Sequence, residues 1–126
     1  HADLSLDTQP YNAHTTASDA LWAGVPVVTC LGDSFAGRVG ASLLHAAGLP
    51  ELVTASPDAY AALAVGLARD PARIAGLEAR LEAERLSCTL FDTDAHRRDI
   101  EQAYLAASKV ISIADNLFST LLQAVR

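Results

Sequence analysis

The fold of this chain is decided by residues 4–28, whose sequence reads LSLDTQPYNAHTTASDALWAGVPVV. The first three residues alternate as in a short strand, and a loop follows them. A helix is then expected from about Thr15 to Ala23, where Gly24 ends it. Residues 25–30 are mostly apolar, as expected of a strand inside a parallel sheet. The order strand, helix, strand predicts a β-α-β unit with parallel strands.

A candidate anion site lies where the first helix begins. His14, Thr15 and Thr16 fall there, and ligands of parallel α/β folds bind beyond the carboxyl ends of the strands. Free amides and the helix dipole favour an anion such as a diphosphate at this point. Thr15 or Thr16 is expected as the N-cap, with Asp19 forming a capping-box-like pair with Thr16. A surface histidine beside a purely structural cap explains the same residues, so the pattern alone leaves both interpretations open.

The rest of the chain predicts one more strand and several helices. They are a helix that Asp33 or Ser34 caps and Gly48 ends, a strand at residues 51–54, and helices that begin at Ser56-Pro57, at Asp70-Pro71, and at Asp92 or Thr93.

The composition excludes several classes of protein. The net charge is −6 and no basic cluster occurs, which argues against a nucleic-acid partner. Cys30 and Cys88 lie far apart and have no metal-ligand spacing, so we expect reduced thiols in the cytoplasm. We also expect no membrane-spanning run and no signal peptide. The absence of methionine and the opening on a strand suggest a fragment of a larger lobe.

Several segments together resemble the C-terminal catalytic lobe of the O-linked N-acetylglucosamine transferases and the related SPINDLY-type glycosyltransferases. The resemblance extends to about Ala107. It is carried by Asp7-Thr8, by Asn12 to Thr16, by Asp19, by Leu21 to Thr29 and by Gly32 to Leu44, and it returns at Ser87 to Phe91 and at Tyr104-Leu105.

The resemblance implies part of a two-lobed, bacterial-type protein glycosyltransferase with Rossmann-like halves. Such an enzyme moves N-acetylglucosamine or a related sugar from a UDP or GDP donor to a Ser or Thr hydroxyl, without a required metal or other cofactor. By residue-for-residue match, His14, Thr15 and Thr16 would hold the donor's diphosphate and Asp19 the ribose. Asp7, Thr8 and Asn12 would line the cleft, although Asp7 and Thr8 could equally well just end the strand.

We therefore expect an α/β fold with a short parallel sheet flanked by helices and a helical C-terminal third. Residues 1–107 would form part of a nucleotide-sugar-binding lobe, and residues 108–126 an apolar helical tail. The parent protein is expected to be an enzyme. This stretch holds no catalytic residue of its own, because the other lobe, the acceptor-protein groove and the family's diphosphate lysine would precede it, so alone it should be inactive.

Two alternatives to this function stay open. The first is a non-enzymatic module that self-associates into a homo-oligomer through its apolar C-terminal helix. The second is a lobe of another nucleotide-sugar glycosyltransferase or of an epimerase, since those folds bind diphosphates in a similar way.

Overall fold

The computed structural model describes residues 2–125 and contains two compact units, His1–Phe91 and Asp92–Arg126. The first unit is an α/β lobe and the second is one long helix. The fold class is therefore as predicted, a short parallel sheet flanked by helices. The expected boundary at residue 107 lies inside the long helix, and the division between the units comes after Phe91.

The sheet of the first unit has three parallel strands in the order β1-β2-β3. Strand β1 is Ser5–Leu6, β2 is Val27–Cys30 and β3 is Val53–Thr54. Ser5 is in register with Val27, and Thr29 with Val53. All four residues of β2 are buried, as expected of a central strand with helices on both faces.

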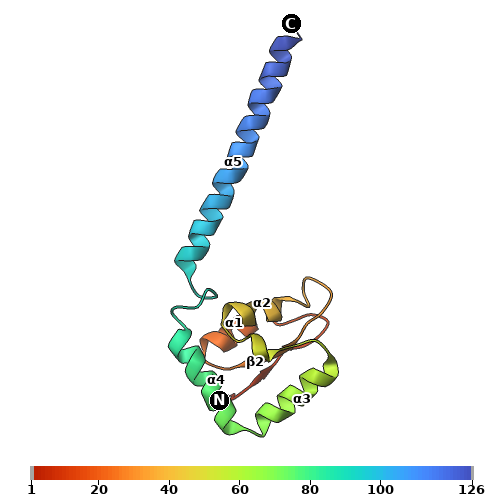
Figure 1. Ribbon diagram of the computed structural model, residues 1–126, viewed down its shortest axis with the longest axis vertical. Helices are drawn as coiled ribbons and strands as arrows, with labels where there is room; N and C mark the ends of the chain where they lie inside the picture. The colour runs from red at the N-terminus through yellow and green to blue at the C-terminus, as the bar shows by residue number, and fades with distance from the viewer. Residues whose placement is uncertain (1, 126) are drawn as a thin grey trace. The chain divides into compact units, whose positions relative to one another are not determined.

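Helices α1 (Thr15–Trp22) and α2 (Val39–Ala46) lie on one side of the sheet and α3 (Pro57–Ala68) lies on the other, and α4 (Pro71–Glu84) packs on α3 (Figure 1). A short 3-10 turn, η1 (Pro50–Leu52), precedes β3. The core between these layers is aliphatic. Its large, fully buried members are Leu21, Val27, Val28, Leu44, Leu49, Leu52 and Leu67.

The ends of α1 and α2 follow the glycine signals in the sequence. Gly24 and Gly48 have φ angles of +84° and +77°, in the left-handed region that side chains disfavour. At each end, the two amides beyond the helix return to the last turn, as in Val25 N to Ala20 O at 2.8 Å. These Schellman motifs satisfy carbonyls that the helix itself leaves unpaired. After each helix the chain therefore turns sharply back toward the sheet.

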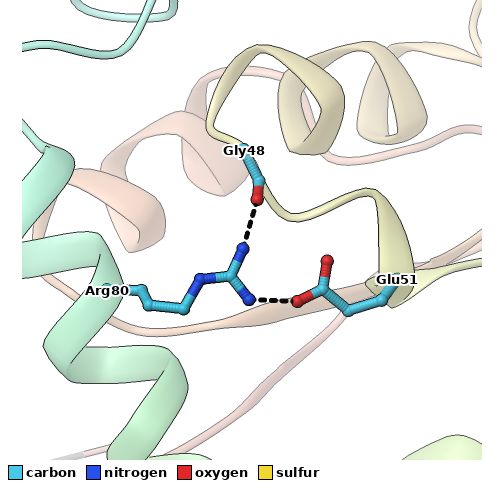
Figure 2. A network of polar contacts seen from close by, with 3 residues as sticks. All are labelled: Gly48, Glu51 and Arg80. Atoms are coloured by element: carbon cyan, nitrogen blue, oxygen red, sulfur yellow. Dashed lines mark hydrogen bonds and ion pairs between the residues drawn. The ribbon is translucent and has the colours of Figure 1, made fainter.

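Helices α3 and α4 begin as predicted. The Ser56 side chain accepts the Ala59 amide, the Asp70 side chain accepts the Arg73 amide, and a proline takes the first helical position in each. The Arg80 side chain then ties α4 to the segment between α2 and β3. Its guanidinium pairs with the Glu51 carboxylate and donates to the Gly48 carbonyl at 2.6 Å (Figure 2).

One expected N-cap and one expected helix start are wrong. Helix α1 has His14 as its N-cap, with no side-chain hydrogen bond, in place of Thr15 or Thr16 with Asp19. Helix α2 begins only at Val39, because Asp33 to Arg38 form a looped turn in which Ser34 Oγ accepts the Gly37 amide. The hydroxyl expected to cap a helix closes a turn instead.

The second unit consists mainly of α5 (Thr93–Ala124), which Asp92 caps by accepting the Ala95 amide at 2.8 Å. By length and composition alone α5 could cross a membrane, with a mean hydropathy of 1.3 in its most apolar window. The expectation of no membrane-spanning run is therefore wrong for α5 by this criterion. Length and hydropathy by themselves are weak evidence for a membrane span.

Candidate functional site

The loop between β1 and α1 is held by the carboxylate of Asp7. Its Oδ1 accepts the amides of Thr8 at 2.8 Å and Ala13 at 2.6 Å, and its Oδ2 accepts the Thr29 hydroxyl at 2.6 Å. Asp7 is 7% exposed and Thr29 is fully buried. Hydrogen bonds to a buried charge are stronger than those between neutral groups. This carboxylate therefore sets where the chain enters α1.

Asn12 closes the same loop from inside and is 1% exposed. Its Nδ2 donates to the Thr8 carbonyl at 3.0 Å, and its Oδ1 accepts the Gly40 amide from the first turn of α2 at 3.3 Å. Asp7 and Asn12 thus lie in the interior rather than on the surface of a cleft, because the loop itself uses their polar atoms. Thr8 is exposed, and its role at a cleft stays a prediction.

Tyr60 of α3 reaches this loop from the opposite side of the sheet. Its hydroxyl donates to the Asp7 carbonyl at 2.7 Å. Burial, the nearby charge of Asp7 and then that of Cys30 raise the pKa of Tyr60 above its ordinary value. The tyrosine is therefore a neutral donor near pH 7, and it ties α3 to the end of β1.

The first turn of α1 keeps its amides free. The first bond into the helix runs from the Ser18 amide to the His14 carbonyl at 3.1 Å. Within residues 2–125, no protein group accepts the amides of Thr15, Thr16 or Ala17. Thr15 and Thr16 are exposed, so their hydroxyls stand beside these amides. This is the donor arrangement that binds anions at helix starts.

His14 stacks on the ring of Tyr11, with the ring centroids 4.8 Å apart and the planes 19° from parallel. The imidazole is partly buried, and its Nε2 is enclosed without a hydrogen-bond partner among the described residues. An enclosed, unpaired ring nitrogen is costly.

Three of the four predicted donor-binding residues, His14 to Thr16, are consecutive in the chain and lie together at the start of α1. The fourth, Asp19, lies on the same helix. Asp19 is exposed and lies one turn after Thr15, so both side chains share a face of α1. Ala17 and Leu21 on the opposite face are buried. Loops after all three strands line an open hollow of about 390 Å³ at the carboxyl edge of the sheet, including Gln9, Asp33 and Ala55.

Sequence reasoning missed the residues that contact Asp7 and the β1–α1 loop from the protein interior. Thr29 and Gly40 looked like ordinary strand and helix residues, and Tyr60 like part of an apolar stripe. A glycine in the first turn of a helix is a signal of close approach. A Cβ on Gly40 would lie 2.3 Å from Asp7 Oδ2. Arg38 donates from Nε to the Gly32 carbonyl at 3.2 Å.

Comparison with known proteins assigns the family. The model of glycosyl transferase family 41 matches residues 1–100, most of the chain. The chain belongs to glycosyl transferase family 41. It is 43% identical over 100 residues to the UDP-N-acetylglucosamine--peptide N-acetylglucosaminyltransferase of Caenorhabditis elegans, and 41% identical over 104 residues to the probable enzyme SEC of Arabidopsis thaliana. A probable SPINDLY transferase of Hordeum vulgare is 39% identical over 102 residues.

These matches cover 79–82% of this chain but only 9–11% of the relatives, so the chain spans about a tenth of their length. A solved structure of a mutant Thermobaculum terrenum O-GlcNAc transferase superposes with a TM-score of 0.76 at 43% identity. That likeness covers 81% of this chain and 20% of the other. The resemblance to the O-GlcNAc transferase and SPINDLY lobe is therefore confirmed, and residues 101–126 lie beyond the family match.

Proposed function

We propose that residues 1–91 form the donor-binding part of a protein O-glycosyltransferase whose donor is UDP-N-acetylglucosamine. The uncapped start of α1 carries this proposal, because it offers free amides and two hydroxyls at the functional edge of a parallel sheet. His14, Thr15 and Thr16 would hold the diphosphate, and Asp19 would accept hydrogen bonds from the ribose hydroxyls. The names of the family 41 relatives favour UDP over GDP.

The chemistry of this arrangement suits the departure of a nucleoside diphosphate. The helix dipole and the free amides stabilise negative charge that grows on the diphosphate as the bond to the sugar breaks. A His14 imidazole that protonates would add a charge-assisted hydrogen bond. The proposal requires no metal ion for this stabilisation.

Titration calorimetry of the chain with UDP tests the diphosphate site. The double variant Thr15→Val and Thr16→Val keeps shape but removes both hydroxyls, and we expect it to weaken binding by roughly tenfold or more. Thr120→Val, on the exposed surface of α5, is the matched control and should bind like the parent. GDP should bind more weakly than UDP. If the double variant and the control bound UDP equally, the hydroxyls of Thr15 and Thr16 would not contact the ligand.

His14→Ser removes the imidazole and offers a side-chain N-cap at the start of α1. Serine is a good N-cap and would accept a first-turn amide, so the free energy of unfolding should rise by about 0.5–2 kcal/mol. The same amide would no longer be free for phosphate, and UDP binding should weaken. A variant that is more stable and binds UDP unchanged would contradict the proposed role of these amides.

Asp19→Asn tests whether Asp19 contacts the ribose hydroxyls of UDP. The loss of affinity should be large for UDP and small for its 2′,3′-dideoxy analogue, because that analogue lacks the hydroxyls that Asp19 would accept. Equal losses for both ligands would place Asp19 away from the ribose.

The chain alone should transfer no sugar to an acceptor peptide, since the proposal leaves the acceptor groove and the general base to the rest of the parent protein. A cytoplasmic location is part of the proposal. It is supported by the free thiols of Cys30 and Cys88.

A further inference from the structure

Helix α5 carries an apolar stripe with a strict heptad spacing. From Ile100 to Val125 the stripe advances by alternating steps of four and three residues. Such spacing keeps one face of a helix against a partner helix over its whole length. A single helix cannot cover its own stripe. The positions of the stripe are Ile100, Tyr104, Ala107, Ile111, Ala114, Phe118, Leu121 and Val125.

Large and small side chains alternate along the middle of this stripe. Ile111 and Phe118 occupy one heptad position, and Ala107 and Ala114 occupy the other. In an antiparallel pair of identical helices, residues of one heptad position face residues of the other. In a parallel pair, each residue faces its own copy. The two orientations therefore give very different packing for this sequence.

We propose that α5 pairs antiparallel with α5 of a second copy of this chain. One register places Ile111 against Ala114 of the second copy and Phe118 against Ala107 of that copy. The same register places Tyr104 against Leu121 and Ile100 against Val125. Every central layer then joins one large and one small side chain. A two-fold axis makes each of these contacts occur twice.

The parallel alternative packs badly. It would stack Phe118 on Phe118 and Ile111 on Ile111 in some layers, and alanine on alanine in the layers between. Alternating overfilled and empty layers lose contact energy in both. The antiparallel register keeps the volume of the central layers even.

The polar residues of α5 favour a protein partner over a lipid one. Gln102, Lys109, Asn116 and Gln123 recur every seven residues and form a polar stripe along the helix. A spanning helix would carry this stripe through hydrocarbon at a high cost. The helix has three basic and four acidic residues, so it also lacks the basic face that binds anionic lipid surfaces.

The size of the stripe suits a stable dimer. Residues 100–125 extend over about 38 Å of helix. Side chains larger than alanine in the stripe and along its flank at Val110 and Leu117 number eight in each helix. At roughly 60–100 Å² of apolar surface each, two helices bury between about 1,000 and 1,600 Å². Specific, stable interfaces bury about 1,200–2,000 Å², which overlaps the upper part of this range.

Sedimentation velocity of the full chain should show a dimer, with twice the 13.2 kDa mass of one chain. Ala114→Ile should weaken the dimer by roughly tenfold or more, since it meets Ile111 of the other copy. Adding Ile111→Ala to that variant exchanges the large and small residues and should restore the dimer. Asn116→Ala on the polar stripe is the control and should leave the dimer unchanged.

Cysteine cross-linking in a Cys88→Ser background tests the orientation. A mixture of chains carrying Tyr104→Cys with chains carrying Leu121→Cys should form a disulfide-linked dimer under mild oxidation. Neither variant alone should do so, because two copies of residue 104 would lie about 26 Å apart.

Three results would overturn the proposal. The first is a monomer at all concentrations, and the second is cross-linking of Tyr104→Cys chains with one another. The third is flotation with phosphatidylcholine and phosphatidylserine vesicles that the Ala114→Ile substitution does not change, which would assign the stripe to a membrane.

Discussion

Gly40→Ala should be among the most destabilising single-methyl changes in the α/β lobe. A Cβ at this position would lie 2.3 Å from Asp7 Oδ2 and 2.7 Å from the Thr29 hydroxyl. Neither atom belongs to the free end of a flexible side chain, because Asp7 is buried and makes three hydrogen bonds that fix the β1–α1 loop. The methyl group must displace the carboxylate or push α2 away from the sheet.

The expected cost combines three effects. Overpacking of a close contact costs about 1–3 kcal/mol. Loss of one hydrogen bond to the buried carboxylate of Asp7 adds about 1.5–3 kcal/mol. Replacing glycine by alanine in a helix returns about 1 kcal/mol. The free energy of unfolding should therefore fall by about 1.5–5 kcal/mol, a large fraction of the stability of a small domain.

Urea denaturation followed by Trp22 fluorescence measures this change. Trp22 is the single tryptophan and contacts Phe91 edge-to-face, so it reports on the α/β lobe. Gly76→Ala is the matched control, because a Cβ there meets no atom within 4 Å. That control should be more stable than the parent by about 0.5–1 kcal/mol. If Gly40→Ala proved as stable as Gly76→Ala, the contact between α2 and Asp7 would be refuted.

Three further substitutions test other polar contacts of the α/β lobe. Thr29→Val keeps the shape of the side chain but removes a donor to the buried Asp7 carboxylate, and it should cost about 1.5–3 kcal/mol in urea denaturation. For Tyr60, the folded pKa lies above the unfolded value, so the unfolded chain loses the proton first and stability should fall as pH rises above about 10. Tyr60→Phe should flatten that fall, and a slope equal to the parent's would contradict the raised pKa. Arg80→Ala removes a half-exposed pair with Glu51, and it should cost no more than about 1 kcal/mol and cost less in high salt.

Local signals in the sequence predicted the elements well where they act within a few residues. Gly24 and Gly48 end their helices in the left-handed conformation, and Ser56 and Asp70 cap theirs. Each of these features depends on the backbone of the same turn, so a single sequence contains the whole signal. The same local reasoning failed at Asp33 and Ser34. Side chains there have two local uses, a helix cap or a tight turn, and the tertiary fold selects the turn.

The sequence alone predicts the site residues but not the residues that position them. The order strand, loop, helix places His14 to Thr16 at the edge of the sheet without any long-range information. Thr29, Gly40 and Tyr60 meet Asp7 across separations of 22, 33 and 53 residues. No periodicity reports a contact at such a distance. Their roles follow only from the packed structure, where α2, α3 and β2 all contact the end of β1.

The free amides at the start of α1 and the buried carboxylate behind them are two parts of one arrangement. Leaving a helix start without a side-chain cap costs about 1 kcal/mol. A serine or aspartate in place of His14 would remove that cost, but its oxygen would occupy the position that a phosphate oxygen needs. The bonds that Asp7 accepts, each about 1.5–3 kcal/mol, hold the loop from the interior side instead. Stability thus comes from atoms that no ligand can reach, and this leaves the outward-facing amides unpaired for an anion.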